Sequence, residues 1–289
     1  MKVNLEQNHY YEQRGGSDLR EQLSSYIDLM DDAIRQGKQL PKDTAAANDI
    51  ALMDDFIAIA NQKKEGLNAH FFRSPLDMVN YVKSLIPSED TTARFVVNMG
   101  SGGIHCIAVD CAIKNGKCSL IGIEPVTMNS LGASMLAIRL QSVCKRELPE
   151  TSLVIMETDM QRSQGECLMF SLFLVKKMHK ECDEFQSLHD KNINRELPLT
   201  QGLIVSVKDA DSLLPPSLMK HTQSPNRLQK YLETRPEAMD CVVNKKGETL
   251  KTRQQRHITT IELGEKTVSY SNSIEQKRIK EAKGLLNNL

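Results

Sequence analysis

Cys167 occupies a position at which a cysteine can act as a nucleophile. It opens a strongly apolar stretch, Cys167–Lys180, that we expect to be a helix, and a polar turn separates it from an extended segment that ends at Asp159. Unpaired backbone N–H groups and the positive end of the helix dipole favour the thiolate, which is the reactive form of cysteine. Gln161 can direct its side-chain amide to the same place and stabilise an oxyanion if Cys167 attacks a carbonyl. The alternative is a buried structural cysteine that caps a core helix, because free cysteines are mostly buried and inert.

A predicted hairpin brings a histidine and a carboxylate together. The apolar runs Ile104–Ile113 and Cys118–Glu124 are separated by Lys-Asn-Gly-Lys, and Asn-Gly between such runs is the strongest short hairpin signal. In that register Glu124 faces Ile107 and lies diagonal to His105, roughly 7–8 Å away at the backbone. We expect the face that carries Ile107 to be the buried one. Taken separately, His105 is also explained as a strand-end histidine with satisfied hydrogen bonds, and Glu124 as a carboxylate that faces solvent.

Together these residues have the types that a cysteine-dependent acyl transfer needs. His105 would take the thiol proton, Glu124 would hold the imidazole tautomer, and Gln161 with backbone N–H groups would receive the oxyanion. The sequence therefore predicts a catalytic constellation built from a hairpin end and a helix start around Cys167.

Two other kinds of site are disfavoured by geometry and spacing. His105, Cys106, Cys111 and Cys118 suggest zinc, but Cys106 and Cys111 point to opposite faces of one strand and cannot converge on one ion. The loop Gly100–Gly103 lacks the spacing of a Walker A motif and precedes a strand rather than a helix. We expect neither a metal site nor a phosphate cradle there.

The composition excludes several classes of protein. Of 289 residues 40% are apolar, enough for a real core, whereas only 4% are aromatic, which disfavours a base-stacking nucleic-acid surface. Seven cysteines without disulfide-like spacing and a polar N-terminus without a secretory signal indicate a reducing compartment. No apolar run reaches the length of a membrane span. Residues 215–289 hold 14 Lys/Arg against 8 Asp/Glu, so an anionic partner is expected for this end of a chain whose net charge is zero.

The elements that must position these residues follow from periodicity and capping signals. Residues 1–16 are expected to be disordered, and 197–216 to be mostly loop. Helices are expected at 17–37, 43–64, 75–87, 129–146, 167–180, 225–233 and 273–286, the fourth with Met135, Ile138 and Val143 recurring on one side. Strands are expected at 67–72, 94–99, 153–156 and 241–244, and within 257–271, besides the hairpin. Lys176, Lys177 and Lys180 form a basic patch, which dipole complementation and solvation also explain.

Seven ordered motifs carry a resemblance to a known family. They are RFVVNMGSGGIH (94–105), NGKCSLIGIEP (115–125), MLAIR (135–139), DMQRSQGEC (159–167), KHTQ (220–223), VNKKGET (243–249) and KRIKEAK (277–283). The chain resembles the YopJ family of bacterial effector acetyltransferases, which type III secretion delivers into the host cell cytoplasm. The resemblance implies an α+β fold with a mixed sheet, in which a papain-like, ubiquitin-like-protease-type cysteine core carries an added helical regulatory part. It divides the chain into a secretion signal (1–16), docking helices (17–70), a catalytic core (71–200) and an anion-binding regulatory region (201–289).

The same resemblance implies the activity and its ligands. Cys167, with His105, Glu124 and Gln161, would take acetyl from acetyl-CoA and pass it to a Ser, Thr or Lys of a host protein such as a MAP kinase kinase. Arg162 and Ser163, beside His105, would contact CoA. Inositol hexakisphosphate would be the activator, and the positions that match its contacts are Lys177, Lys220, His221, Arg253 and Lys277.

Two competing functions are also open for this sequence. A cysteine isopeptidase that acts on ubiquitin-like conjugates would need the same triad, because it also begins with thiolate attack on a carbonyl. A kinase-binding effector that only sequesters its target would need none of the catalytic residues.

Overall fold

The structure is a computed structural model that describes residues 16–87, 90–263 and 266–289. The predicted disorder and secretion signal of residues 1–16 lie outside the described residues, except for Gly16, which already belongs to the first described helix. Within the described part of the chain, no helix is both long and apolar enough to cross a membrane.

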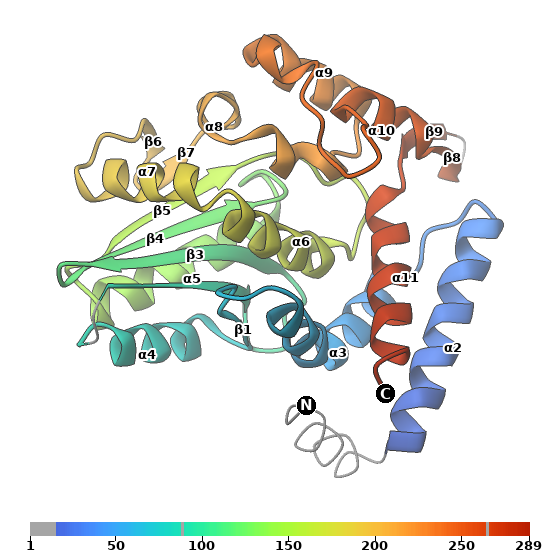
Figure 1. Cartoon of the computed structure of the whole chain (residues 1–289), viewed down its shortest axis with the longest axis horizontal. Coiled ribbons are helices and arrows are strands. Elements are labelled where there is room, and N and C mark those ends of the chain that lie inside the picture. Colours follow the sequence, from blue (N-terminus) through green and yellow to red (C-terminus); the bar gives the residue numbers. More distant parts are fainter. Residues whose placement is uncertain (1–15, 88–89, 264–265) are drawn as a thin grey trace.

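A seven-stranded mixed sheet forms the centre of the molecule (Figure 1). Its strand order is β1-β2-β3-β4-β5-β7-β6, antiparallel from β2 to β4 and parallel between β1 and β2, β4 and β5, and β5 and β7. The strands are β1 (Ala69–Phe72), β2 (Thr91–Asn98), β3 (Cys106–Lys114), β4 (Lys117–Glu124), β5 (Ser152–Glu157), β6 (Leu199–Gln201) and β7 (Ile204–Val205). The fold is therefore the α+β class with a mixed sheet, as predicted.

The hairpin between β3 and β4 has the predicted register. Lys114 pairs with Lys117, and Ala108 pairs with Ile123, so the two loop residues are Asn115 and Gly116. Both have positive φ, 51° and 74°, as the mirror-image turn favoured by Asn-Gly requires. This register carries Glu124 to the end of β4 beside the residues that precede β3.

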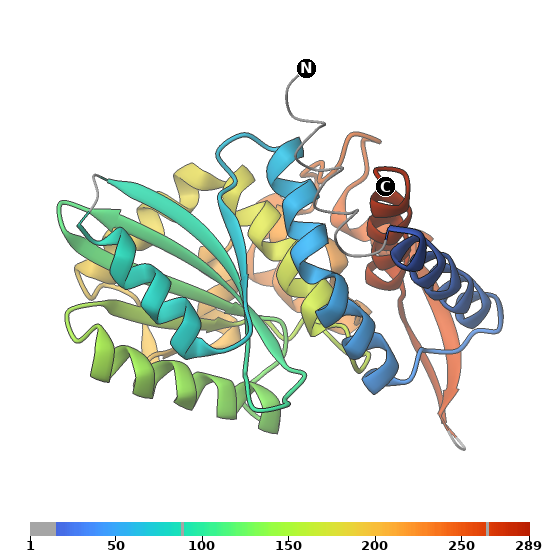
Figure 2. The same ribbon diagram turned by 90° about the horizontal axis from the view of Figure 1, so that it is seen from below.

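Helices cover both faces of the sheet, so the prediction of one buried hairpin face was wrong. Ile107 packs in a core with α4 (Pro75–Leu85) and α5 (Leu131–Glu147), whereas Ala108 packs on the opposite face with α6 (Cys167–Lys180). Figure 2 shows α4 and α5 on one side of the sheet, and α3 (Lys42–Lys63) and α6 on the other. A strand in the middle of a three-layer structure is buried on both faces, and its sequence is then apolar throughout rather than alternating.

Other differences lie where tertiary contacts override local pattern. On α5 the recurring side is mostly exposed: Ile138 is 65% exposed, although Val143 packs partly against the core. The buried side carries Ala133, Leu136, Ala137 and Leu140. The expected loop 197–216 contains β6, β7 and α8 (Val207–Leu213), because β7 adds to the sheet edge at β5. Residues 241–244 form no strand. Helices α7 (Cys182–Ile193) and α10 (Leu250–Arg256) were not predicted.

A second layer of helices packs at one end of the sheet (Figure 1). It combines α2 (Gly16–Arg35) and α3 with α11 (Ser273–Leu286), which contacts α2, α3 and α6. Nearby lie α9 (Pro225–Thr234), α10 and a two-stranded sheet of β8 (Ile258–Leu263) and β9 (Lys266–Ser271). The two ends of the described chain, α2 and α11, thus pack on each other, and α3 and α11 both contact the helix that begins with Cys167.

Candidate active site

Cys167 is the first residue of α6, as the sequence predicted. Its side chain is buried, with 4% of the residue exposed, and Sγ lies 3.4 Å from the carbonyl oxygen of Ile104, to which the thiol donates. Ile104 directly precedes His105. The start of α6 therefore contacts the segment that leads into β3.

His105 and Glu124 form an ion pair at the open end of the hairpin. His105 Nε2 lies 2.9 Å from Glu124 Oε2, and Glu124 Oε1 accepts the backbone N–H of Val126 at 3.2 Å. Glu124 is fully buried, so it is not the solvent-facing carboxylate of the alternative interpretation. A Cβ atom at Gly132, near the start of α5, would lie 3.1 Å from Cβ and Cγ of His105, so a larger residue there would press on the histidine side chain.

The surroundings of His105 favour its protonated form. Burial alone lowers the pKa of His105, but the charge of Glu124 and hydrogen bonds to Cys167 and Glu124 outweigh it and raise this pKa to about 10. The imidazole therefore holds a proton at neutral pH and lies within hydrogen-bonding reach of the thiol. Such a pair can stabilise a thiolate and later return a proton to a leaving group.

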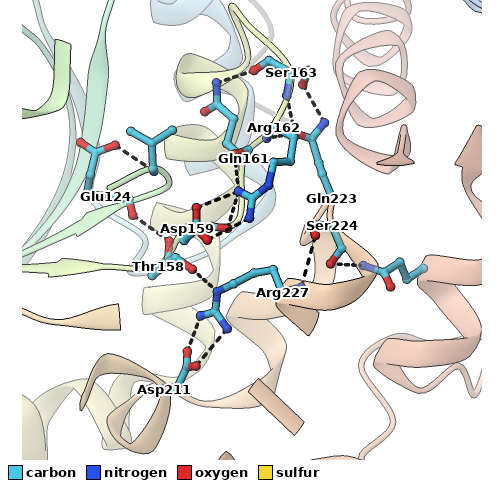
Figure 3. A network of polar contacts seen from close by, with 12 residues as sticks. Glu124, Thr158, Asp159, Gln161, Arg162, Ser163, Asp211, Gln223, Ser224 and Arg227 are labelled. Carbon is cyan, nitrogen blue, oxygen red and sulfur yellow. Dashed lines mark hydrogen bonds and ion pairs between the residues drawn. The ribbon is translucent and has the colours of Figure 1, made fainter. Parts of the chain in front are cut away.

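The loop 158–166 between β5 and α6 is anchored from several sides (Figure 3). The backbone N–H and the hydroxyl of Thr158 both donate to the carbonyl oxygen of Glu124, at 3.0 and 2.7 Å. Arg227, on α9, donates from Nε to the carbonyl oxygen of Thr158 at 2.8 Å and pairs with buried Asp211. The start of this loop is therefore tied both to the backbone of Glu124 and to the C-terminal region.

Gln223, which the sequence analysis placed only within a motif, holds the middle of the same loop. Its Oε1 accepts the backbone N–H groups of Arg162 and Ser163, and its Nε2 donates to Ser163 Oγ at 2.6 Å (Figure 3). Gln223 is fully buried. No spacing in the sequence signals a contact between residues 60 positions apart, so sequence reasoning missed its role.

Gln161 lies in this loop, but its amide has a partner of its own. Nε2 donates to the carbonyl oxygen of Ser163 at 2.8 Å, and the backbone N–H donates to Pro125 O at 2.9 Å. Oε1 of Gln161 is buried and has no hydrogen-bond partner. The second N–H of the amide is the group that an oxyanion would use, and this role stays a prediction.

Arg162 and Ser163, the predicted CoA contacts, have different surroundings. The guanidinium of Arg162 is partly exposed and binds Asp159 through two nitrogens, each at 2.8 Å (Figure 3). Ser163 is buried, and its hydroxyl accepts from Gln223. An incoming anionic group would therefore meet Arg162 at the surface and compete with Asp159 for it.

A strongly basic cavity of about 480 Å³ lies between α6, α10, α11 and the short helix at 216–221. All five positions predicted for a polyanion line it, namely Lys177, Lys220, His221, Arg253 and Lys277. Six further lysines and one arginine that the sequence analysis did not assign to it also do so, namely Lys64, Lys176, Lys180, Lys245, Lys246, Lys280 and Arg256. None of the lining residues among the described ones is acidic.

The cations of this cavity are crowded. Burial, followed by repulsion from neighbouring cations, lowers the pKa values of Lys177 and Lys220 to about 8. His221 is fully buried, which lowers its pKa well below its usual value, and its Nδ1 is 2.8 Å from Ser273 Oγ. Within the part of the chain that the structure describes, no carboxylate forms an ion pair with Lys177 or Lys220. A compact polyanion would relieve this repulsion.

Sequence comparison identifies relatives along most of the chain. The family model described as "YopJ Serine/Threonine acetyltransferase" matches residues 23–284. The serine/threonine-protein acetyltransferase YopJ of Yersinia pestis is 37% identical over 267 residues, which cover 92% of this chain and 91% of that protein. The serine/threonine-protein acetyltransferase HopZ1a of Pseudomonas syringae pv. syringae is 25% identical over 147 residues.

Solved structures of related proteins share the fold. A structure of AvrA delL154 with IP6 and CoA matches with a TM-score of 0.81 and 36% identity, covering 92% of this chain and 98% of that one. A structure of HopZ1a in complex with IP6 and CoA matches with a TM-score of 0.69 and 20% identity, covering 92% and 98%. The second likeness, at this low identity, speaks for the fold alone.

Proposed function

Because the chain belongs to the YopJ family of serine/threonine acetyltransferases, we propose that Cys167, His105 and Glu124 are the residues that carry this activity. The observation that supports the proposal is the 2.9 Å pairing of His105 with buried Glu124, together with the interaction with Cys167, at the start of α6, that helps to raise the pKa of His105. A nucleophile, its acid–base partner and the residue that orients this partner are thus neighbours.

The proposed reaction has two steps. The Cys167 thiolate attacks the carbonyl carbon of acetyl-CoA, the bond to the CoA sulfur breaks, and His105 gives the leaving thiolate its proton. The hydroxyl of a Ser or Thr on the acceptor protein then loses its proton to His105 and attacks the carbonyl carbon of the Cys167 thioester, the bond to Sγ breaks, and the Cys167 thiolate leaves. Backbone N–H groups near Cys167 and the free N–H of Gln161 stabilise the oxyanion in both steps. A lysine acceptor would follow the same course.

Arg162 and Ser163 are the proposed contacts of the CoA part of the substrate. Arg162 is the partly exposed guanidinium of the loop that leads to Cys167, and guanidinium groups suit phosphate. Ser163 contributes through the backbone that Gln223 holds in place. The AvrA structure with IP6 and CoA, at 36% identity, supports this assignment by analogy.

We propose inositol hexakisphosphate as the activator that binds the basic cavity. The residues fit such a polyanion, since the cavity is lined by eleven Lys and Arg side chains and three of the lysines, Lys176, Lys177 and Lys220, have pKa values lowered to about 8. Lys177, Lys220, His221, Arg253 and Lys277 would hold it, joined by the cations that the sequence did not reveal. Its charge would neutralise repulsion between α6, α10 and α11.

The remaining parts of the proposal concern the type of catalytic core, the roles of the terminal regions, the acceptor proteins and the place of action. The sheet with α6 on one face would correspond to the papain-like, ubiquitin-like-protease-type core (71–200). The helices of 17–70 would select the partner, and residues 201–289 would respond to the anion. The acceptors would be host MAP kinase kinases or related kinases, reached after type III secretion into the host cell cytoplasm.

One incubation separates the proposed transfer from the two alternatives. The protein is mixed with labelled acetyl-CoA, inositol hexakisphosphate and a kinase substrate, and the label is mapped by intact mass and peptide analysis. Label on a Ser or Thr of the kinase, absent with Cys167→Ala, supports transfer. Cleavage of a ubiquitin-like conjugate without CoA would instead support the isopeptidase. A cellular effect that survives Cys167→Ala would support sequestration.

Glu124→Gln will move the alkaline limb of the pH profile of kcat/KM to lower pH. Without the charge of Glu124, the His105 imidazolium is held less strongly, so its pKa falls from about 10. We expect a shift of at least about one pH unit and a loss of about 10²-fold in kcat/KM at neutral pH. By the same linkage, the pair stabilises the fold fully below pH 6.5 and loses this contribution as the pH rises through about 10. Glu157→Gln, on the neighbouring strand β5, is the control, and coincident alkaline limbs for Glu124→Gln and the wild type would contradict the assignment.

Binding of inositol hexakissulfate will weaken as the pH rises through about 8. The sulfate groups stay ionised throughout, so only the protein changes charge, and Lys177 and Lys220 have pKa values of about 8 in the free protein. Neutral lysines attract the anion less, and we expect the Kd to rise at least about tenfold between about pH 7 and pH 9.5 at constant ionic strength. Calorimetric titration measures this, and a Kd independent of pH would argue against these two lysines as contacts.

A further inference from the structure

Arg278 is an almost completely buried arginine next to the nucleophile. Its side chain is 1% exposed and lies on α11, 111 residues beyond Cys167 in the sequence. Its guanidinium makes five hydrogen bonds. Neither the catalytic steps nor the basic cavity accounts for this residue.

Two of these hydrogen bonds reach the turn that positions the nucleophile. Arg278 Nη1 donates to Glu166 Oε1 at 2.6 Å, and Nη2 donates to the carbonyl oxygen of Gly165 at 3.0 Å. Glu166 is the residue that precedes Cys167 at the start of α6. The guanidinium therefore binds the backbone of Gly165 and the side chain of Glu166, the two residues before Cys167.

The other three hydrogen bonds go to Asp49 on α3. Arg278 Nε lies 3.1 and 3.0 Å from the two carboxylate oxygens, and Nη2 lies 2.9 Å from Oδ2. Asp49 also accepts the hydroxyl of Tyr26, on α2, at 3.0 Å. One guanidinium thus joins α2, α3 and α11 to the turn before Cys167.

The turn itself tolerates little displacement. Gly165 has a φ of +81°, and a Cβ there would lie 3.0 Å from Cα and O of Lys42, the first residue of α3. The turn is therefore clamped between the start of α3 and Arg278. A shift of α11 along or about its axis would move the guanidinium against this turn.

The same helix lines the basic cavity with other side chains. Lys277 and Lys280 line the cavity, whereas Arg278 points into the buried network. Lys277 also shares Glu281 with Lys176 of α6, the latter ion pair being 3.0 Å long. A single rigid helix thus presents cations to the cavity and a guanidinium to the nucleophile turn.

We propose that Arg278 is a positioning residue that couples occupation of the basic cavity to the reactivity of Cys167. A polyanion that binds Lys277 and Lys280 fixes α11, and Arg278 then holds Gly165 and Glu166 so that the thiol faces His105. This inference rests on the proposed function in that it takes a polyanion as the activator. The coupling runs through one helix, which carries the cations that line the cavity and the guanidinium that contacts the turn, so both sites act on the position of α11.

Alkylation of Cys167 by iodoacetamide, followed by peptide mass spectrometry, tests the coupling in the full-length protein. Inositol hexakisphosphate will accelerate alkylation of Cys167 in the wild type by at least about fivefold, the lower end of typical coupling. Arg278→Lys keeps the charge, but one ammonium group cannot reach Asp49, Glu166 and Gly165 together. We expect it to bind the anion with a Kd within about threefold of the wild type by calorimetry, because Arg278 does not line the cavity, and to lose most of the acceleration.

Arg94→Lys is the matched control. Arg94 is equally buried and donates to the carboxylate of Asp110 and to the carbonyl oxygens of Gly66 and Leu67, but it has no contact with the loop before Cys167. Its replacement costs a similar set of bonds and will leave the acceleration intact. Glu166→Gln offers a second route, because it weakens the contact between Arg278 and the residue that precedes Cys167 while leaving the Arg278–Asp49 pair in place.

The outcomes separate this inference from the function on which it rests. If the wild type binds no inositol hexakisphosphate, the proposed activation fails and the coupling fails with it. If the wild type binds the anion and its thiol responds, but Arg278→Lys and Glu166→Gln respond equally, only the coupling is overturned. Loss of the response in Arg94→Lys as well would reduce Arg278 to a structural residue and overturn the proposal.

Discussion

Cys167→Ala will lower acetyl transfer to a kinase substrate by at least about 10⁴-fold, the scale on which removal of a nucleophile acts in enzymes with a catalytic triad. Sγ is the atom that would carry the acetyl group, and no other group at the start of α6 can replace it. The side chain is small and buried, so the fold should survive. The same variant will keep the stabilisation by inositol hexakisphosphate, because Cys167 does not line the basic cavity.

Cys182→Ala supplies the matched control for this experiment. Cys182 is also the first residue of a helix, α7, but it is exposed, and its Sγ lies near Asp183 rather than a histidine. The variant therefore tests whether a helix N-terminus alone is enough to make a cysteine nucleophilic in this chain. Transfer is measured with labelled acetyl-CoA in single-turnover and steady-state assays. Residual activity of Cys167→Ala above one hundredth of the wild type would show that another group carries the acetyl.

Replacing Lys177 and Lys220 together by Gln is the second change with a large expected effect. It will weaken binding of the anion and stabilise the anion-free protein. The affinity for inositol hexakisphosphate will fall by about 10²-fold or more, since each charge-assisted hydrogen bond contributes about 1.5–3 kcal/mol. At an anion concentration of 100 times the wild-type Kd, the wild type gains about 2.7 kcal/mol of stability, and the double variant will lose most of it.

The stability of the anion-free protein will change in the other direction. Both lysines have a folded-state pKa near 8, well below the ordinary value of 10.5, so their charged forms are disfavoured in the fold at neutral pH. Removing the charges relieves this repulsion, and the melting temperature without anion should rise. The paired replacement of exposed Lys145 and Lys191 by Gln is the control. Thermal melts with and without the anion measure both effects, and an unchanged anion-induced shift in the double variant would contradict the cavity assignment.

Much of the local structure was predictable from short patterns because short-range physics decides it. The Asn-Gly turn set the register of β3 and β4, since both residues tolerate positive φ. Ser74 and Ser224 begin α4 and α9 by accepting backbone N–H groups of the first turn, each at 3.2 Å. In each case the deciding contacts lie within a few residues of one another.

The candidate active site was predictable to the extent that it is built from these local elements. The hairpin register carries Glu124 beside His105, and the predicted helix start coincides with Cys167. That the end of the β3–β4 hairpin lies next to the start of α6 was an expectation, and only the fold could test it. Gln161 shows the limit, since its amide donates to Ser163, a contact that spacing alone did not reveal.

By itself, the sequence determined the family, the hairpin register, the helix that begins with Cys167 and the types of residue that could react. Only the tertiary structure decided which cations converge and what holds the nucleophile turn. Lys64, Lys246 and Lys280 come from three distant segments to one cavity, and Arg278 reaches Glu166 across 112 positions. Charges that far apart leave no periodicity or spacing in the sequence, because their approach depends on the packing of whole helices against the sheet.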